Sequence, residues 1–252
     1  MSEGEGNMKE KKIADIRLFE ELACTKSLPT YMGEIYKLEK DTRLICTRFA
    51  RKLREKGFIT GNFDHLYIVS TPLLREQIIQ ESVRGTEQRV KYYDVGVTVD
   101  SFNRKTKQEK ELYLLKLISN VLQQIASNTE QLSLILDVYH IMLQLGSEMA
   151  IKHLSKETSQ YKVTISYQIK SLQEKSTAII EYPDYKKRVT RKAAFLDLNM
   201  YEDIYYLVSS ITVKNGMICL KPRLSQTASY HTQAYPTPIT IPIHDIPLLE
   251  IE

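Results

Sequence analysis

The segment 161–170 constrains the fold most, because apolar and polar residues alternate along it without a break. The apolar positions are Tyr161, Val163, Ile165, Tyr167 and Ile169, and the polar ones are Lys162, Thr164, Ser166, Gln168 and Lys170. Successive side chains of a strand point to opposite faces, so this pattern predicts a strand with one buried and one wet face. A half-wet sheet is typical of antiparallel or edge pairing.

Further apolar patterns predict more strands. They lie at 63–72, 89–99, 176–182, 192–198, 211–213 and 217–220. Asn215-Gly216 separates the last two segments and is a strong hairpin signal, because a type I′ turn needs positive φ at both central positions. Pro72 stops the first segment, since proline cannot donate to a strand ladder.

Helical periodicity predicts helices at 36–56, 107–126 and about 130–154, with a short one from Met200 to 208. Gly57 follows the first helix where a left-handed cap belongs. Asn128 or Thr129 caps the third helix and Asn199 the short one. The third helix is apolar on most sides through Leu145, so we expect it at the centre of the core. His140 and His153 would then share roughly one of its faces, as hydrogen-bonded core or rim histidines.

The predicted order of elements indicates an α+β fold, with mostly antiparallel sheets packed against long amphipathic helices. We expect a disordered lead at 1–12 and a single α+β domain at 13–222. Related runs of helices and strands at 30–126 and 130–222 allow a degenerate duplication. Four of the eight prolines lie at positions 236, 238, 242 and 247. Because proline removes backbone donors, we expect an extended tail at 223–252.

The sequence lacks the usual signs of an enzyme. Its nine glycines are scattered, which excludes a glycine-rich phosphate cradle, and its five histidines never pair at metal-ligand spacing. We therefore expect no catalytic set, no cofactor and no metal. The widely spaced Cys24, Cys46 and Cys219 indicate reduced thiols in the cytoplasm. The amino terminus has no apolar core of a secretory signal, and no apolar run is long enough to span a membrane.

Asp64-His65 is an adjacent acid and imidazole pair that invites acid–base chemistry. Neighbouring strand residues point to opposite faces, so we do not expect these two side chains to hydrogen-bond to each other. The acidic groups around 92–100 and 181–197 show no cation-loop spacing. An enzyme assembled from distant carboxylates, tyrosines and His65 remains an alternative, since catalytic residues often converge only in the fold.

Two basic runs suggest a second kind of partner. Residues 43–56 contain six basic residues and 186–192 contain five. Such runs can bind phosphates or an acidic protein surface, and tyrosines beside the second run could stack on single-stranded nucleic acid. The same runs are also typical of a solvated helix face and a solvated turn between strands, which we favour.

Two segments resemble bacterial immunity proteins that neutralise polymorphic toxins. They are GFITGNFDHLYIVSTP at 57–72 and VKYYDVGVTVDSFNRKTKQEKELYLLKLISNVLQQI at 90–125, under a third of the chain. The resemblance implies a non-enzymatic cytoplasmic protein that binds a toxin domain and blocks its active site. Such a partner needs an interface of roughly 1,600 Å² with aromatic and arginine anchors. The candidate contacts are Tyr92, Tyr93, Tyr182, Tyr185, Arg188 and Arg191.

Overall fold

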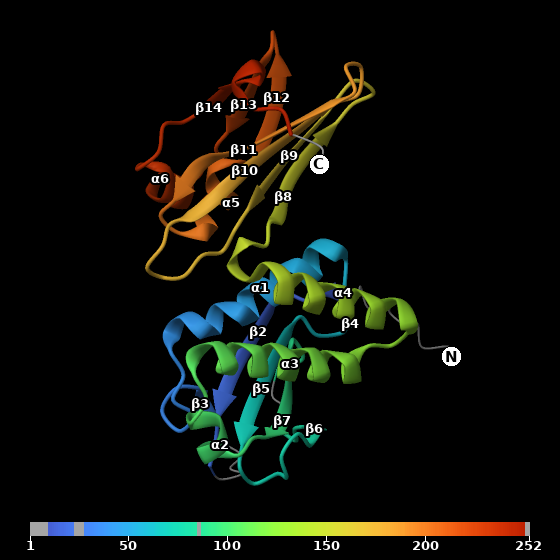
Figure 1. Ribbon diagram of the computed structural model, residues 1–252, viewed down its shortest axis with the longest axis vertical. Helices are drawn as coiled ribbons and strands as arrows, with labels where there is room; N and C mark the ends of the chain where they lie inside the picture. Colours follow the sequence, from blue (N-terminus) through green and yellow to red (C-terminus); the bar gives the residue numbers. More distant parts are fainter. Residues whose placement is uncertain (1–9, 23–27, 85–86, 250–252) are drawn as a thin grey trace, which may run out of the picture. The chain divides into compact units, whose positions relative to one another are not determined.

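The chain divides into two compact units, Met1–Gly146 (unit 1) and Ser147–Glu252 (unit 2), shown in the computed structural model of Figure 1. The structure describes residues 10–22, 28–84 and 87–249. The division after Gly146 differs from the single domain expected over 13–222, and it falls later than the boundary expected between 126 and 130.

Unit 1 combines a five-stranded sheet with helices. Its strands are β1 (Lys11–Lys12), β2 (Asp15–Glu20), β3 (Thr30–Tyr31), β4 (Ile59–Gly61), β5 (His65–Thr71), β6 (Ile79–Glu81) and β7 (Val90–Gly96). Its helices are η1 (Lys40–Arg43), α1 (Leu44–Lys56), α2 (Val99–Asn103), α3 (Lys107–Ile125) and α4 (Thr129–Leu145). The sheet order is β3-β2-β5-β7-β6, and β1 pairs separately with β4. The three central strands are parallel, and the edge strands β3 and β6 are antiparallel to their neighbours.

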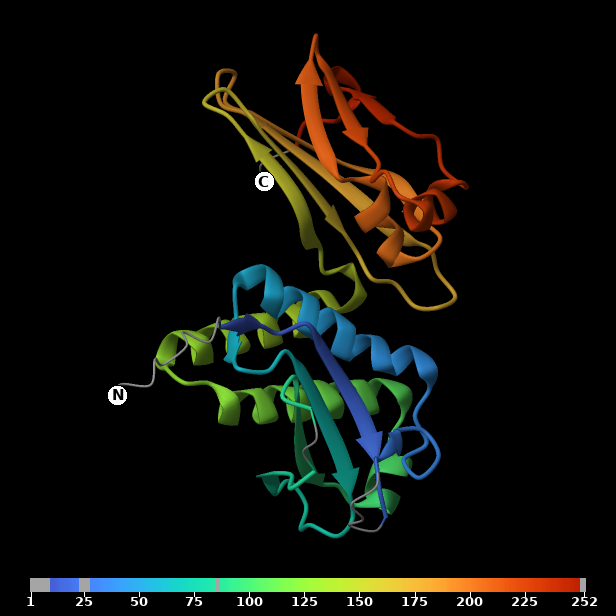
Figure 2. The same cartoon turned by 180° about the vertical axis from the view of Figure 1, so that it is seen from behind.

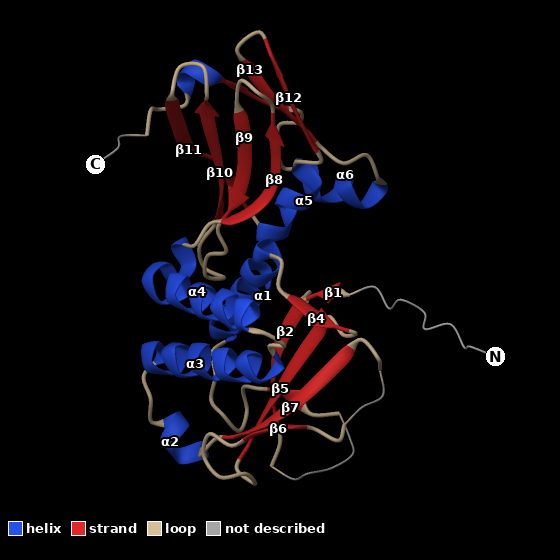
Figure 3. Cartoon of the chain, turned by 90° about the vertical axis from the view of Figure 1, so that its right-hand side faces the viewer, coloured by secondary structure: helices blue, strands red, loops and turns tan. Residues whose placement is uncertain are grey.

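The register of the parallel strands sorts their side chains into two faces. Arg17, Tyr67 and Tyr92 lie side by side on β2, β5 and β7. Leu18 and Ile68, one residue further along their strands, are buried and belong to the opposite face. Figure 3 shows α1, α3 and α4 on one side of this sheet, and Figure 2 shows β2 and β5 running in the same direction from behind.

Local sequence signals set the helix ends. Gly57 ends α1 with a φ of 86°, as predicted. Thr106 begins α3 through a capping box with Glu109, and the Asn128 side chain accepts from Gln131 N at the start of α4. The predicted helix at 130–154 is wrong beyond α4, because the chain turns at Gly146 and continues as a strand.

Helix α4 is also less central to the core than its composition suggests. Ile135, Val138 and Met142 are buried, but Leu136 and Leu143 are 40% and 43% exposed. Its apolar residues therefore surround the helix while only one stripe is packed.

Unit 2 is built mainly from antiparallel strands. Its strands are β8 (Ile151–Glu157), β9 (Lys162–Tyr167), β10 (Ser176–Asp184), β11 (Val189–Leu198), β12 (Ser210–Lys214), β13 (Met217–Lys221) and β14 (Ile239–Pro242). Its helices are η2 (Gly146–Glu148, which starts at the end of unit 1), η3 (Tyr201–Asp203), α5 (Ile204–Leu207), α6 (Gln226–Thr232) and η4 (Ile243–Asp245). The strands form a β11-β10-β9-β8 sheet and a β12-β13-β14 sheet.

Several predictions for unit 2 are confirmed. Val163, Ile165 and Tyr167 of β9 are buried on one face, as their alternation indicates. Asn215 and Gly216 have φ values of 51° and 73° and join β12 to β13. The short helix after Asn199 is present, but Asp203 caps it, with its carboxylate accepting from Met200 N.

The proline-rich segment is part of unit 2, which corrects the expected extended tail at 223–252. It forms α6 and then β14, which pairs antiparallel with β13 as an edge strand. Pro236 and Pro238 precede β14 and Pro242 is its last residue, so the strand interior contains no proline. Arg191 in β11 donates to the backbone oxygen of Ile246 and holds the end of this segment.

The α+β fold with mostly antiparallel strands is confirmed, but unit 1 has a parallel centre that the sequence did not indicate. Strand β2, one of its three parallel strands, was not predicted. The units have different sheet topologies, so they do not repeat one another. In the expected lead 1–12, residues 1–9 lie outside the described residues, whereas Lys11–Lys12 form β1. No helix in the described ranges is both long and apolar enough to cross a membrane.

Candidate binding face of unit 1

One face of the parallel sheet has no helical layer among the residues that the structure describes. Helices α1, α3 and α4 cover the other face (Figure 3). Parallel strands usually have both faces covered, so this uncovered face is unusual. We call it the open face. It carries Arg17 and Phe19 of β2, Tyr67 of β5 and Tyr92 of β7.

Four aromatic rings form a continuous strip on the open face, which we call the aromatic strip: Phe19, Tyr31, Tyr67 and Tyr92. The Phe19 and Tyr31 rings stack with their centroids 4.8 Å apart. Tyr67 lies 5.0 Å from Phe19 and 5.2 Å from Tyr92, edge-on to the latter. Phe19, Val69 and Tyr92 form a separate hydrophobic cluster, so the strip has its own packed base. Tyr31 is half exposed and gives the strip its outer edge.

A cavity of about 490 Å³ opens over the aromatic strip. The four rings line it together with Leu28, Pro29 and Thr30 of the segment that leads into β3. Most of the lining is apolar. This volume is in the range of sites that accept a small molecule or a large side chain.

Arginine side chains flank the aromatic strip. Arg17 lies 5.4 Å from the Tyr67 ring centroid, donates to the Tyr31 hydroxyl at 2.9 Å and pairs with Asp15 at 2.5 Å. Burial alone would lower the pKa of Arg17, but the neighbouring Asp15 carboxylate outweighs it and raises the pKa. Burial raises the pKa of Tyr67, so its hydroxyl stays protonated at neutral pH.

A second, smaller hollow of about 160 Å³ adjoins the cavity, with Tyr31 lining both. Asp15, Arg17 and Arg43 contribute its charged groups. Arg43 lies 5.7 Å from the Tyr31 ring centroid and donates to the backbone oxygen of Met32 at 2.6 Å. Its Nε is buried without a hydrogen-bond partner in the described part of the chain.

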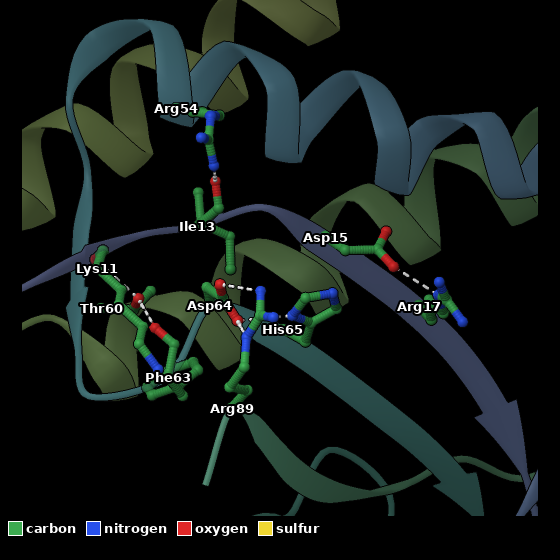
Figure 4. Close-up of polar contacts among 10 residues, drawn as sticks. All are labelled: Lys11, Ile13, Asp15, Arg17, Arg54, Thr60, Phe63, Asp64, His65 and Arg89. Carbon is green, nitrogen blue, oxygen red and sulfur yellow. Dashed lines mark hydrogen bonds and ion pairs between the residues drawn. The ribbon is translucent and has the colours of Figure 1, made fainter. Parts of the chain in front are cut away.

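At the amino end of the open face, Arg89, Asp64 and His65 form a charged cluster (Figure 4). Arg89 donates from Nε and Nη2 to the two Asp64 oxygens, at 3.1 and 2.6 Å. His65 Nδ1 lies 2.7 Å from Asp64 Oδ1. The Arg89 hydrogen bonds, followed by the His65 contact, lower the pKa of Asp64 to about 2, against the opposing effect of burial.

The contact between Asp64 and His65 corrects the expectation that these side chains stay apart. That expectation assumed a strand at both positions. Strand β5 begins at His65, so Asp64 precedes it and does not follow the alternation of its side chains. The His65 ring lies edge-on to Tyr67 at 6.3 Å, which joins the cluster to the aromatic strip.

Tyr92 lies in the aromatic strip, although only 8% of it is exposed. Tyr93 belongs to the opposite face of β7 and is buried. Tyr182 of β10 is buried as well. Only a small part of each of these three predicted contacts is exposed, because each tyrosine lies inside a strand with packed neighbours.

The remaining predicted contacts belong to unit 2. Tyr185 and Arg188 are exposed in the turn between β10 and β11, where the Tyr185 hydroxyl donates to Glu157 at 2.5 Å. Arg191 is partly buried by its bond to the Ile246 oxygen. Tyr92 and Tyr93 lie in unit 1, so the six predicted contacts are divided between the units.

The basic run at 43–56 is engaged largely within unit 1. Lys52 pairs with Glu55 at 2.9 Å, and Arg54 donates to the Ile13 oxygen at 3.4 Å (Figure 4). The basic run at 186–192 begins in the exposed β10–β11 turn.

Sequence reasoning missed a second carboxylate and imidazole pair, in unit 2. Asp203 is buried, accepts from the Tyr235 hydroxyl at 2.5 Å and lies 3.0 Å from His231 Nδ1. Burial and then Asp203 raise the pKa of Tyr235 to about 12. These residues are far apart in sequence, so no spacing signal could have found them. His153, placed in β8 and not in a helix, has its Nε2 2.7 Å from the Val208 oxygen, and burial lowers its pKa.

No group of three or more histidine, cysteine, aspartate or glutamate residues in the described ranges could hold a metal ion. Comparisons with protein-family models, curated proteins and solved structures returned no match to this chain. The geometry of the open face is therefore the basis for a functional proposal.

Proposed function

We propose that this protein is an immunity-type inhibitor that binds a bacterial toxin domain through the open face of unit 1. The observation that carries the proposal is the uncovered face of the parallel sheet, where Arg17 and Arg43 lie beside rings of the aromatic strip. Tyrosine and arginine are the residues that most often dominate the binding energy of protein interfaces. A tyrosine ring also supplies a large contact area at a low cost in conformational entropy.

The two segments that resemble immunity proteins meet on this face. Segment 57–72 contains β5, and segment 90–125 begins with β7. These strands are adjacent and parallel, and their register places Tyr67 beside Tyr92. The resemblance and the aromatic strip therefore support the same surface, and the two segments supply Tyr67 and Tyr92 of the strip.

The test uses a candidate toxin domain, sought first in the genes that neighbour the gene for this protein. We expect co-expression to rescue cells from that toxin domain, and calorimetry with the purified proteins to show a one-to-one complex. Tyr31→Ala should weaken binding by about tenfold or more, because it removes the half-exposed ring of the strip. Tyr230→Ala, at an exposed tyrosine of α6 in unit 2, is the matched control and should bind as the wild type does.

Absence of both rescue and binding would refute the proposal. Equal losses for Tyr31→Ala and Tyr230→Ala would place the interface elsewhere.

A second candidate function is binding of single-stranded nucleic acid. Aromatic rings on a sheet face with nearby arginines can stack bases and contact phosphates. Filter binding of a radiolabelled oligonucleotide over a salt series distinguishes this function, because phosphate contacts make affinity fall steeply with salt. Salt-dependent retention that Tyr31→Ala abolishes would favour nucleic acid over a toxin domain.

A further inference from the structure

We propose that the two hollows on either side of Tyr31 accept an aromatic side chain and an adjacent acidic side chain of the partner. The ring would enter the cavity over the aromatic strip, and the carboxylate would reach the smaller hollow beside Arg43. This inference rests on the proposed function, and it specifies the chemistry that the open face recognises.

The larger cavity fits a side-chain ring better than a nucleobase. Its lining is mostly apolar, with the aromatic strip on one side and Leu28 and Pro29 on the other. A nucleobase would bury polar edges against this lining and leave them without hydrogen bonds, which costs free energy. An apolar ring avoids that cost and gains offset or edge-on contacts with Phe19, Tyr67 and Tyr92.

The smaller hollow has the charge that a carboxylate requires. Arg17 and Arg43 contribute two positive charges and Asp15 one negative charge, which leaves one positive charge among these three. Cys46 also lines the hollow, and burial raises the pKa of its thiol well above the usual range, so it is neutral.

Arg43 is the group best placed to bind the carboxylate. Its Nε is buried and unpartnered within the described ranges, which normally costs stability. Arg17, by contrast, already pairs with Asp15. A guanidinium binds a carboxylate through two parallel hydrogen bonds, which would also fix the direction of the incoming chain.

Tyr31 separates the two hollows and is held from three sides. Its ring stacks on Phe19, Arg43 lies over the ring, and its hydroxyl accepts from Arg17. The wall between the hollows is therefore fixed before binding. Preorganisation of this kind reduces the entropy lost on association.

The direct test uses a phenylalanyl-aspartate dipeptide with an acetylated amino end and an amidated carboxyl end. The matched probes are the phenylalanyl-asparagine dipeptide and uridine monophosphate. Titration of the full chain, followed by amide chemical shifts in NMR, should show the aspartate dipeptide shifting signals of Phe19, Tyr31 and Tyr67. We expect it to bind about tenfold more tightly than the asparagine dipeptide, because the asparagine dipeptide lacks one charged hydrogen-bonded contact.

Two variants separate the hollows. Tyr67→Ala removes a ring that lines the cavity and should weaken the binding of both dipeptides. Arg43→Met keeps the apolar stem of the side chain but removes its charge. This variant should therefore bind the asparagine dipeptide as the wild type does, and it should lose the preference for the aspartate dipeptide. Circular dichroism of each variant checks the fold. The wild-type titration tests the site even if a variant fails to fold.

The outcomes distinguish this inference from the proposed function. If the toxin domain binds wild type and Tyr67→Ala equally, or if the dipeptides shift no signals of the aromatic strip, the anchor site is refuted while the proposed function stands. If the aspartate dipeptide binds at the strip but no toxin domain does, the site stands and the proposed function fails. Tighter binding of uridine monophosphate than of the dipeptides would overturn the assignment to a protein side chain.

Discussion

At the scale of single residues, buried charges are satisfied by partners that only the fold provides. Glu20, which is 1% exposed, illustrates this. Its carboxylate accepts from the backbone N–H groups of residues 33, 34, 35 and 36, at 2.8 to 3.0 Å. The sequence shows only an acidic residue after an apolar run, and nothing in it indicates that a loop thirteen residues later closes around the side chain. The same holds for Asp203 with His231 and Tyr235.

Asp64 gives a prediction about pH at this scale. Its pKa falls from an ordinary value of 3.8 in the unfolded chain to about 2 in the folded protein, chiefly through Arg89. The folded state therefore binds the proton less tightly, and this stabilisation is present above pH 3.8 and is lost as the pH falls towards about 2. In Asp64→Asn, the free energy of unfolding should depend less on pH across this window.

The measurement is urea denaturation of the wild type and Asp64→Asn at several pH values between about 2 and 5. Asp197→Asn, at an exposed position of β11, is the control and should retain the wild-type slope. If the free energy of unfolding changed with pH in the same way for all three proteins, the ion pair assigned to Asp64 and Arg89 would be contradicted.

At the scale of elements, sequence patterns correctly predicted the features that depend only on neighbouring residues. The caps at Asn128 and Gly57 and the hairpin at Asn215-Gly216 are confirmed, because each depends on one or two neighbouring residues. Sequence patterns failed where contacts between helices and strands determine the secondary structure. The mostly apolar residues 132–145 are followed by further apolar residues at 149–151, yet helix α4 ends at Leu145, a 3-10 turn follows at Gly146–Glu148, and strand β8 begins at Ile151. Strand β2 was not predicted, although residues 15–18 alternate between polar and apolar as a strand does.

Gly96, at the end of β7, gives a prediction at this scale. A Cβ on this residue would lie 1.9 Å from the backbone oxygen of Arg75, because the segment before β6 crosses closely over β7. Gly96→Ala must displace backbone, so we expect a loss of about 3 kcal/mol or more in the free energy of unfolding, as for severe overpacking. Gly57→Ala is the comparison: nothing lies within 4 Å of its Cβ and only the left-handed backbone is strained.

The measurement is chemical denaturation of both variants, with about 1 kcal/mol expected for Gly57→Ala. A loss for Gly96→Ala no greater than that for Gly57→Ala would show that the segment before β6 can move away from β7.

At the scale of the whole molecule, the open face lies within unit 1. Its strands, its covering helices and the aromatic strip all come from residues before Gly146. Residues 10–146 expressed alone should therefore fold cooperatively and bind the toxin domain within about threefold of the full chain. Circular dichroism melting and calorimetry check this. A fragment that folds cooperatively but does not bind would show that unit 2 contributes to the interface.

The sequence by itself determined the fold class, about half of the strands in the described ranges and several helix ends. These features follow from local periodicity, from caps and turns, and from short stretches of residues. Only the tertiary structure decided which strands are parallel, that Tyr92 faces the cavity while Tyr93 is buried, and that Asp64 joins Arg89 and His65. The physical reason is that a strand's pairing partners and the covered face of a sheet depend on residues distant in sequence, whose contribution no local pattern records.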